Sequence, residues 1–370
     1  MSQDKSGNGN GLHPLYQDYL RQKCFIAYSE KASWTEDLLS ACEEVISESP
    51  LNLQLDYARK HFEPDVPLRE KALEIIANAR CGIYDLSYWR DSSGEWQMPY
   101  NVLIELGMAI ALNRPILLLR HANNKKLQLP ECLKGLSDYI IVFRGHTTLK
   151  RLLKEKDALK WLYSCSEFSP ERGWWNRFCI FGHQLCDYRA IHPRGTHLGQ
   201  TNLRCHISDS PDGREDFRGV IEEVLERFND ITYSYTDKLS FTEGYKFLLC
   251  SHCQTVRSTS FAIYRITPNS PPEMFISIGM SIAVEKQFNY KIPKILITES
   301  LEDVPSLLSG YEVVVARSDK EKKDYLKKFI PTVMGKVRDT IWNPQILPFE
   351  TPLIFEPEED DRPIVAPVSI

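Results

Sequence analysis

The sequence predicts an α/β protein made of two tandem copies of one parallel-sheet unit. Short apolar segments typical of buried strands alternate with segments of helical periodicity, the pattern of a parallel sheet with helices on both faces. The same order of segments recurs in the second half of the chain. A length of 370 residues is sufficient for two domains, each with its own core.

The first copy is expected to begin with an apolar strand and to continue with alternating helices and strands. The helix after the first strand carries an apolar face that includes Leu38, Cys42 and Ile46. The expected elements are a strand at 24–30, a helix at 34–46, a helix after Pro67, a strand at 81–87, a helix at 101–112, and strands at 115–119 and 138–143.

The second copy is expected to repeat this order. In its most apolar helix, Gly279 aligns with Gly107 of the first copy, and Ala283 aligns with Ala111. The expected elements are a strand at 205–210, a helix at 217–228, a strand at 261–267, a helix at 273–284, and strands at 294–298 and 311–317. Agreement at so many elements in one order predicts a duplication.

These segments predict five parts of the chain, at 1–20, 21–165, 166–202, 203–342 and 343–370. The first is a polar, flexible leader, and the second and fourth are the two copies. The third is rich in Trp, Arg and His, which favours a packed connector over a free linker. The last is a tail rich in proline and acidic residues, expected to be an extended arm.

The composition argues against several classes of protein. With 45 basic and 50 acidic residues the net charge is −5, so no general attraction to nucleic acid is expected. No apolar run approaches the roughly 18 residues that span a membrane. The N-terminus lacks an apolar signal core, so we expect a cytoplasmic chain with reduced cysteines.

No metal or other cofactor is expected. The one CxxC pair, Cys250 and Cys253, falls where a helix is expected, whereas a structural zinc site needs four ligands. Neither a GxGxxG segment nor a P-loop is present, which argues against hydride transfer and against nucleoside triphosphate hydrolysis.

Candidate site residues cluster where the strands of the first copy end. Ligands of open parallel sheets bind at the carboxyl ends of the strands, which indicates Tyr28, Ser29 and Asp85, together with Asn101 at the start of the next helix. Glu105 is a lone carboxylate among apolar neighbours, which is costly unless it is paired or functional. The alternative is that Glu105 is a solvated or capping residue.

The loop before this helix contains two further aromatic candidates. Trp89 and Trp96 either cover a pocket at this edge or take part in ordinary loop packing.

Two segments of the first copy resemble known families. The segment CFIAYSEKASWTEDLLSACEEV, at 24–45, resembles the opening box of TIR domains. The segment YDLS, followed by NVLIELGMAIALNRPILLL, is similar to TIR-like and nucleoside 2-deoxyribosyltransferase-like nucleotide-processing domains. The resemblance covers most of 23–143 and implies a flavodoxin-like sheet with a Glu on the helix after the middle strand.

The resemblance implies a hydrolase or transferase acting on an N-glycosidic bond, with NAD as the best-motivated substrate and a possible place in immune or antiviral signalling. Glu105 would then be the catalytic carboxylate that stabilises the oxocarbenium-like transition state. Asp85 and Asn101 would hold the ribose or the base, and Tyr28 and Ser29 would line the floor of the site.

The second copy departs from this pattern. Arg265 stands in the place of Asp85, Ser277 in the place of Glu105, and Glu273 in the place of Asn101. No glycosidase is expected there. Arg265 is a candidate for binding an anionic ligand, and the alternative is an ordinary surface arginine.

Two alternatives to an enzyme remain open at this point. The chain is either a module that recognises a nucleotide without turnover or an interaction protein of the TIR type. A homo-oligomer is possible in each case. The interaction protein would have an empty crevice, with Glu105 paired to a nearby Arg or Lys.

Overall fold

The structure is a computed structural model, and it describes residues 23–49, 53–61, 66–112, 114–124, 129–133, 140–155, 158, 203–209, 217–238, 248–288 and 291–342. The expected leader, connector and tail lie outside the described residues, as do the two boundaries predicted for the first copy, at 21 and 165. Among the residues described, no helix is long and apolar enough to cross a membrane.

The first half forms a five-stranded parallel sheet with the order β2-β1-β3-β6-β7. Its strands are β1 (Lys23–Ala27), β2 (Gln54–Asp56), β3 (Cys81–Asp85), β6 (Ile116–His121) and β7 (Ile140–Phe143). Its helices are α2 (Thr35–Ser47), α3 (Leu68–Asn78), α4 (Tyr100–Ala111) and α5 (His146–Lys154), with short 3-10 turns η1 (Ala58–His61) and η2 (Ala122–Asn124). A two-stranded hairpin, β4 (Trp89–Arg90) and β5 (Trp96–Gln97), lies between β3 and α4.

The second half forms a second five-stranded parallel sheet, β12-β11-β10-β8-β9. Its strands are β8 (Leu203–Ser208), β9 (Ile231–Tyr235), β10 (Phe261–Ile266), β11 (Lys294–Thr298) and β12 (Val313–Val315). Its helices are α8 (Phe217–Leu225), α9 (Leu248–Arg257), α10 (Pro272–Phe288) and α11 (Asp319–Trp342), with 3-10 turns η6 (Thr236–Lys238), η7 (Leu301–Asp303) and η8 (Ser306–Leu308).

The two sheets have the same topology and the same register. Read from the opposite end, the second order matches the first, and both correspond to the 2-1-3-4-5 order of flavodoxin-like folds. Ile26 pairs with Ile83 in the first sheet, and Ile207 pairs with Ile263 in the second. The predicted α/β class with parallel sheets is therefore confirmed. The edge strands β2 and β9 were not predicted, because both carry polar residues and β2 has only three residues.

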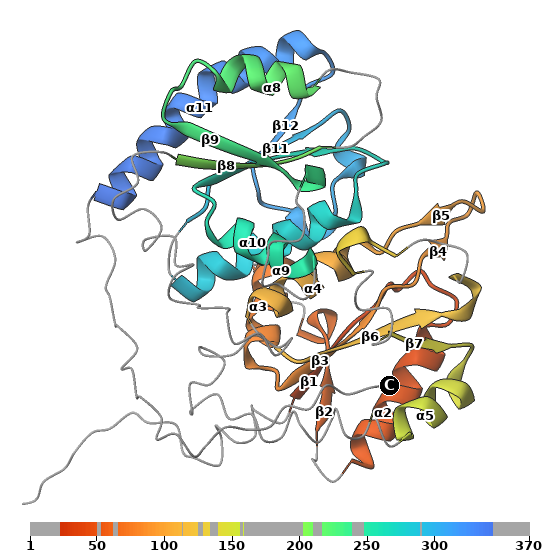
Figure 1. Cartoon of the computed structure of the whole chain (residues 1–370). Helices are drawn as coiled ribbons and strands as arrows, with labels where there is room; N and C mark the ends of the chain where they lie inside the picture. The colour runs from red at the N-terminus through yellow and green to blue at the C-terminus, as the bar shows by residue number, and fades with distance from the viewer. Residues whose placement is uncertain are drawn as a thin grey trace, which may run out of the picture.

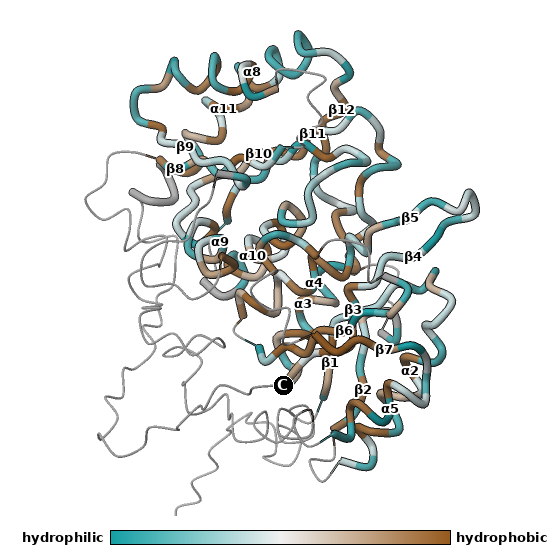
Figure 2. Tube along the Cα trace, turned by 45° about the vertical axis from the view of Figure 1, so that its right-hand side comes forward, coloured by the Kyte–Doolittle hydropathy of each residue, from teal (hydrophilic) through white to brown (hydrophobic). Residues whose placement is uncertain are grey.

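The elements stack in layers, with both sheets facing a shared centre (Figure 1). Helices α3 and α4 of the first copy and α9 and α10 of the second fill the space between the sheets, and their apolar side chains form one continuous core. Helices α2 and α5 cover the outer face of the first sheet, and α8 and α11 cover the outer face of the second. In Figure 2 apolar residues accordingly concentrate along β1, β6, α4 and α10.

The two copies approach most closely where α4 crosses α10. A Cβ atom added to Gly107 would overlap the carbonyl oxygen of Ile276, and one added to Gly279 would overlap the carbonyl oxygen of Ile104. Because these four residues occupy matching positions in the repeat, the contact is reciprocal, as in the self-complementary interface of a two-fold dimer. The aligned glycines therefore allow the two helix backbones to touch.

We predict that Gly107→Ala or Gly279→Ala destabilises the chain by about 3 kcal/mol, because the added methyl group meets backbone that cannot move aside. The matched control is Gly335→Ala in α11, where a Cβ has open space and the better helix propensity is worth up to about 1 kcal/mol. Urea unfolding followed by circular dichroism measures the free energy of unfolding of all three variants. Equal stability of the Gly107 and Gly335 variants would contradict the contact.

Candidate functional site

At the carboxyl edge of the first sheet, a buried polar cluster forms around Asp85. The indole Nε1 of Trp34 donates to Asp85 Oδ2 at 2.9 Å, and the amide of Ser87 donates to Oδ1 at 3.1 Å. The Ser87 hydroxyl also donates to Oδ1, and it accepts a hydrogen bond from the amide of His121 at 2.6 Å. Burial raises the pKa of Asp85, and these hydrogen bonds oppose that rise. Asp85 therefore orients the side chains around it.

Trp34 is held firmly in this cluster. Its ring stacks on His121 with centroids 4.3 Å apart and planes 3° apart, in addition to its bond to Asp85. The residue lies just before α2 and is only 8% exposed. One edge of a fixed aromatic ring thus reaches the surface at the end of the strands.

Beside Trp34 lies a half-open cleft of about 490 Å³. It is lined by Lys31, Ser33, Trp34, Arg90, Trp96 and Asn123. None of these six residues is acidic, and two carry a positive charge. The Arg90 guanidinium lies 4.7 Å from the centre of the Trp96 ring, and the Lys31 ammonium lies 5.0 Å from the centre of the Trp89 ring.

The β4–β5 hairpin supplies one wall of this cleft. Asp91 fixes the turn by accepting hydrogen bonds from the amides of Ser93 and Glu95, both at 2.9 Å, and from the Gln97 side chain at 2.6 Å. Hydrogen bonds from the Ser93 and Gln97 side chains and from these amides lower the pKa of Asp91. Gly94 has φ 85°, a conformation that favours glycine. The turn thereby holds Arg90 of β4 and Trp96 of β5 together at the wall of the cleft.

The structure brings only part of the predicted site together. Tyr28 packs edge-on against Tyr57 at 5.8 Å, and the backbone oxygen of Ser29 accepts a hydrogen bond from Thr35. Neither Tyr28 nor Ser29 lines the cleft, and Asp85 lies behind Trp34. Trp96 does line it, as one of the two readings of that loop predicted.

Lys31, Arg90 and Asn123 are functional candidates that the sequence analysis did not identify. The signal that could have indicated the hairpin is the Asp-Ser-Ser-Gly turn at 91–94, flanked by the dipeptides Trp-Arg and Trp-Gln.

Glu105 lies in the interior and does not line the cleft. It is 8% exposed on α4, and no hydrogen bond or ion pair of its carboxyl group is found among the residues that the structure describes. Burial raises the pKa of Glu105 to about 8, and its charge would act on the buried Tyr84 hydroxyl. The carboxyl group is thus mostly protonated, and therefore neutral, near pH 7.

Asn101 contacts the other copy. Its side-chain amide donates to the Ser306 hydroxyl at 2.9 Å, and its oxygen accepts from the amide of Leu307 at 3.3 Å. Glu273, the residue at the matching position in α10, accepts from the amide of Glu131 in the first copy. Each copy therefore holds a loop of the other through the first turn of its central helix, and Asn101 is a contact between copies.

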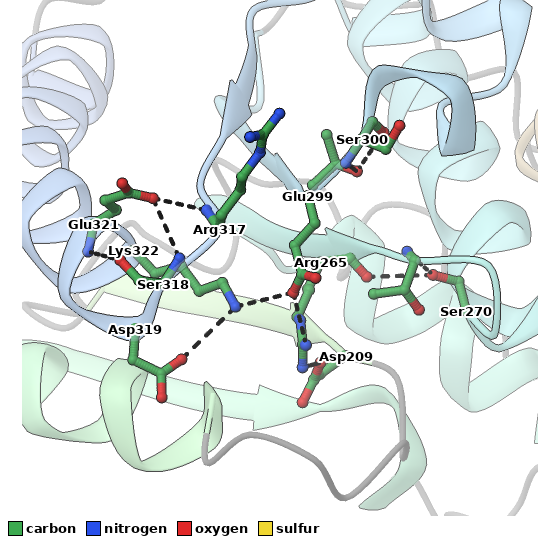
Figure 3. A network of polar contacts seen from close by, with 12 residues as sticks. Asp209, Arg265, Ser270, Glu299, Ser300, Arg317, Ser318, Asp319, Glu321 and Lys322 are labelled. Carbon is green, nitrogen blue, oxygen red and sulfur yellow. Dashed lines mark hydrogen bonds and ion pairs between the residues drawn. The ribbon is translucent and has the colours of Figure 1, made fainter.

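At the carboxyl edge of the second sheet, Arg265 is enclosed by charges of its own chain (Figure 3). Its guanidinium lies 3.4 Å from carboxylate oxygens of both Asp209 and Glu299. The fully buried Lys322 ammonium, on α11, lies 3.2 Å from the same Glu299 oxygen. Arg265 is 6% exposed, so it is not an ordinary surface arginine. Internal carboxylates occupy the position where an anionic ligand would bind.

Comparisons with known proteins identify no family for this chain. No family model matches the chain, and no curated protein matches it. The chain aligns with a crystal structure titled as a putative UDP-N-acetylglucosamine 2-epimerase from Listeria monocytogenes, at 11% identity and a TM-score of 0.28, over 87% of this chain and 90% of that one. Similarity at this level carries no argument about activity.

The expected cleavage of an N-glycosidic bond in NAD or a nucleoside is wrong. The geometry gives the physical reason, since a carboxylate must reach the anomeric carbon to stabilise an oxocarbenium ion, and Glu105 lies in the core. The expectation that Glu105 lies among apolar neighbours is met by its burial on α4.

We predict that Glu105 makes the stability of the chain depend on pH. Folding raises the pKa of Glu105 from 4.5 to about 8. Its contribution to the free energy of unfolding is therefore complete below pH 4.5 and is lost as the pH rises toward 8. Glu105→Gln should remove this loss and stabilise the chain by roughly 3 kcal/mol at pH 7, at about 1.4 kcal/mol for each pH unit. Glu74→Gln on the exposed face of α3 is the matched control. Parallel stability profiles for wild type and Glu105→Gln from pH 5 to pH 8 would refute this assignment.

Proposed function

We propose that the first copy is a binding module for a small anionic ligand that also carries an aromatic ring, the chemistry of a nucleotide. The observation that supports this most directly is the lining of the cleft, where Lys31 and Arg90 lie among tryptophans and no lining residue is acidic. The proposal concerns binding and includes no bond cleavage.

The charges and rings of the cleft suit the two halves of such a ligand. Arginine and lysine form charge-assisted hydrogen bonds with phosphate oxygens, which are stronger than bonds between neutral groups. Base stacking on aromatic rings and on guanidinium planes contributes about 1–3 kcal/mol per base. Because Arg90 lies over Trp96, the hairpin offers both kinds of contact side by side.

The difference between the copies supports a single site in each chain. The connection from β3 to α4 spans residues 86–99 and contains the hairpin, whereas the connection from β10 to α10 spans only residues 267–271. The matching edge of the second sheet is closed by the ion pairs of Arg265. The second copy therefore serves as the structural partner of the first.

The strand order 2-1-3-4-5 also supports the resemblance to TIR-like and deoxyribosyltransferase-like domains, which we keep as a proposal about ancestry. A role in immune or antiviral signalling remains a prediction, as do a cytoplasmic location and a homo-oligomeric state.

Isothermal titration with AMP tests the proposed site. We expect AMP to bind, and Arg90→Gln to weaken its affinity about tenfold or more, because a charge-assisted hydrogen bond is worth about 1.5–3 kcal/mol. Lys31→Gln should act in the same direction. The matched control is Arg227→Gln, which removes an exposed arginine paired with Glu223 in the second copy.

Three further ligands resolve which half of AMP is recognised. Ribose 5-phosphate retains the charge, adenosine retains the ring, and pyrophosphate retains charge alone. We expect AMP to bind more tightly than any of the three, and Trp96→Leu to reduce AMP binding while pyrophosphate binding stays unchanged. The absence of binding by all four ligands, or binding that Arg90→Gln leaves intact, would reject the site.

A further inference from the structure

Two buried histidines distinguish the interior of the second copy from that of the first. His206 lies on β8 and His252 lies on α9, and each is 1% exposed. Strand register places His206 at the position of Phe25, because both residues precede matched pairs of isoleucines. His252 lies nine residues before β10, as Ala72 lies nine residues before β3. Both matching positions are apolar, so the fold itself does not require histidine.

The surroundings of the pair are polar, and no ion pair of either imidazole is found among the described residues. His206 Nε2 lies 3.1 Å from the Thr236 hydroxyl, and its ring meets Tyr264 edge-on at 6.0 Å. The Nδ1 atoms of His206 and His252 have no hydrogen-bond partner among the described residues, and neither does the nearby hydroxyl of Ser208 on β8. Buried polar atoms without a partner are uncommon and costly.

The charged groups on the neighbouring elements are already engaged elsewhere. Asp237 in η6 pairs with Arg218 at 2.8 Å, and Glu285 in α10 pairs with Lys294 at 2.6 Å. Arg257, at the end of α9, donates to the backbone oxygen of Ala111. On the described parts of these elements, a positive charge on either imidazole would therefore meet no free carboxylate.

Burial governs the protonation of both rings. It lowers the pKa of His252 to about 4, and burial together with the charge of His252 lowers the pKa of His206 to about 3. Because both values fall below the ordinary 6.5, the pair contributes stability that is complete above pH 6.5 and is lost as the pH falls toward 4 and 3.

We propose that His206 and His252 form an acid-sensitive pair of buried side chains, which releases α9 from the second sheet when both imidazoles become protonated. Helix α9 also bridges the copies, since Arg257 Nη2 donates to the oxygen of Ala111 at the end of α4 at 2.5 Å. Release of α9 removes this bond and loosens the junction between the copies. The inference is independent of the ligand proposed for the first copy.

Hydrogen exchange measured by mass spectrometry at pH 7.5 and pH 5.5, corrected for the intrinsic rate, tests this directly on the full chain. Two protons favour the open form by up to about 100-fold for each pH unit below 6.5, so protection of α9 should fall about 100-fold. Helix α3, which carries Ala72 at the matching position, is the internal control and should keep its protection.

Substitution with the residues of the first copy completes the test. His206→Phe combined with His252→Ala should keep α9 protected at pH 5.5. If the double variant fails to fold, His252→Gln, which keeps a neutral polar group and leaves His206 to titrate, should limit the loss of protection to about tenfold. Protection of α9 that is the same at both pH values in wild type would overturn the proposal. An equal loss of protection in α3, or in His252→Gln, would also overturn it.

Discussion

The close crossing of α4 and α10 is the contact on which the rest of the structure depends. It brings two helix backbones together at Gly107 and Gly279, and it seals one apolar core between the two sheets. Around it, Asn101 and Glu273 each hold a loop of the opposite copy. Because the contact is reciprocal, a change at one glycine affects the same interface as a change at the other, and neither copy has a separate inner core.

The two copies have inverted charges at the carboxyl edges of their sheets. Asp85 on β3 lies near His121 at the end of β6, while Arg265 on β10 pairs with Glu299 at the end of β11, at positions that the strand register makes equivalent. At the first edge, Asp85 accepts a hydrogen bond from Trp34 and holds that ring beside an open cleft. At the second edge, Arg265 forms ion pairs with Asp209 and Glu299 of the same chain. A duplicated fold has thus produced one open edge and one closed edge.

Sequence periodicity was sufficient to predict what local pattern determines. The alternation of strands and helices, the duplication and the burial of α4 followed from it, because each depends on which residues are apolar. Glu105 and Asn101 were interpreted as site residues because their helix has no polar face, and the sequence alone did not show that the second copy covers that helix. The cleft was missed for a related reason, since Lys31 and Arg90 are far apart in the sequence and come to line one cleft only in the folded chain.

The interface between α4 and α10 also affects how separate molecules of this protein can associate. In a two-fold dimer of single units, the α4 face would be the contact surface, and the strength of the contact would depend on concentration. Here the second copy covers that face permanently, so the partner is always present at a high effective concentration. Any homo-oligomer of the whole chain must therefore use a different surface. Because the second copy contributes to stability by covering this face, it does not need a binding site of its own. This agrees with the carboxyl edge of the second sheet, which the ion pairs of Arg265 close.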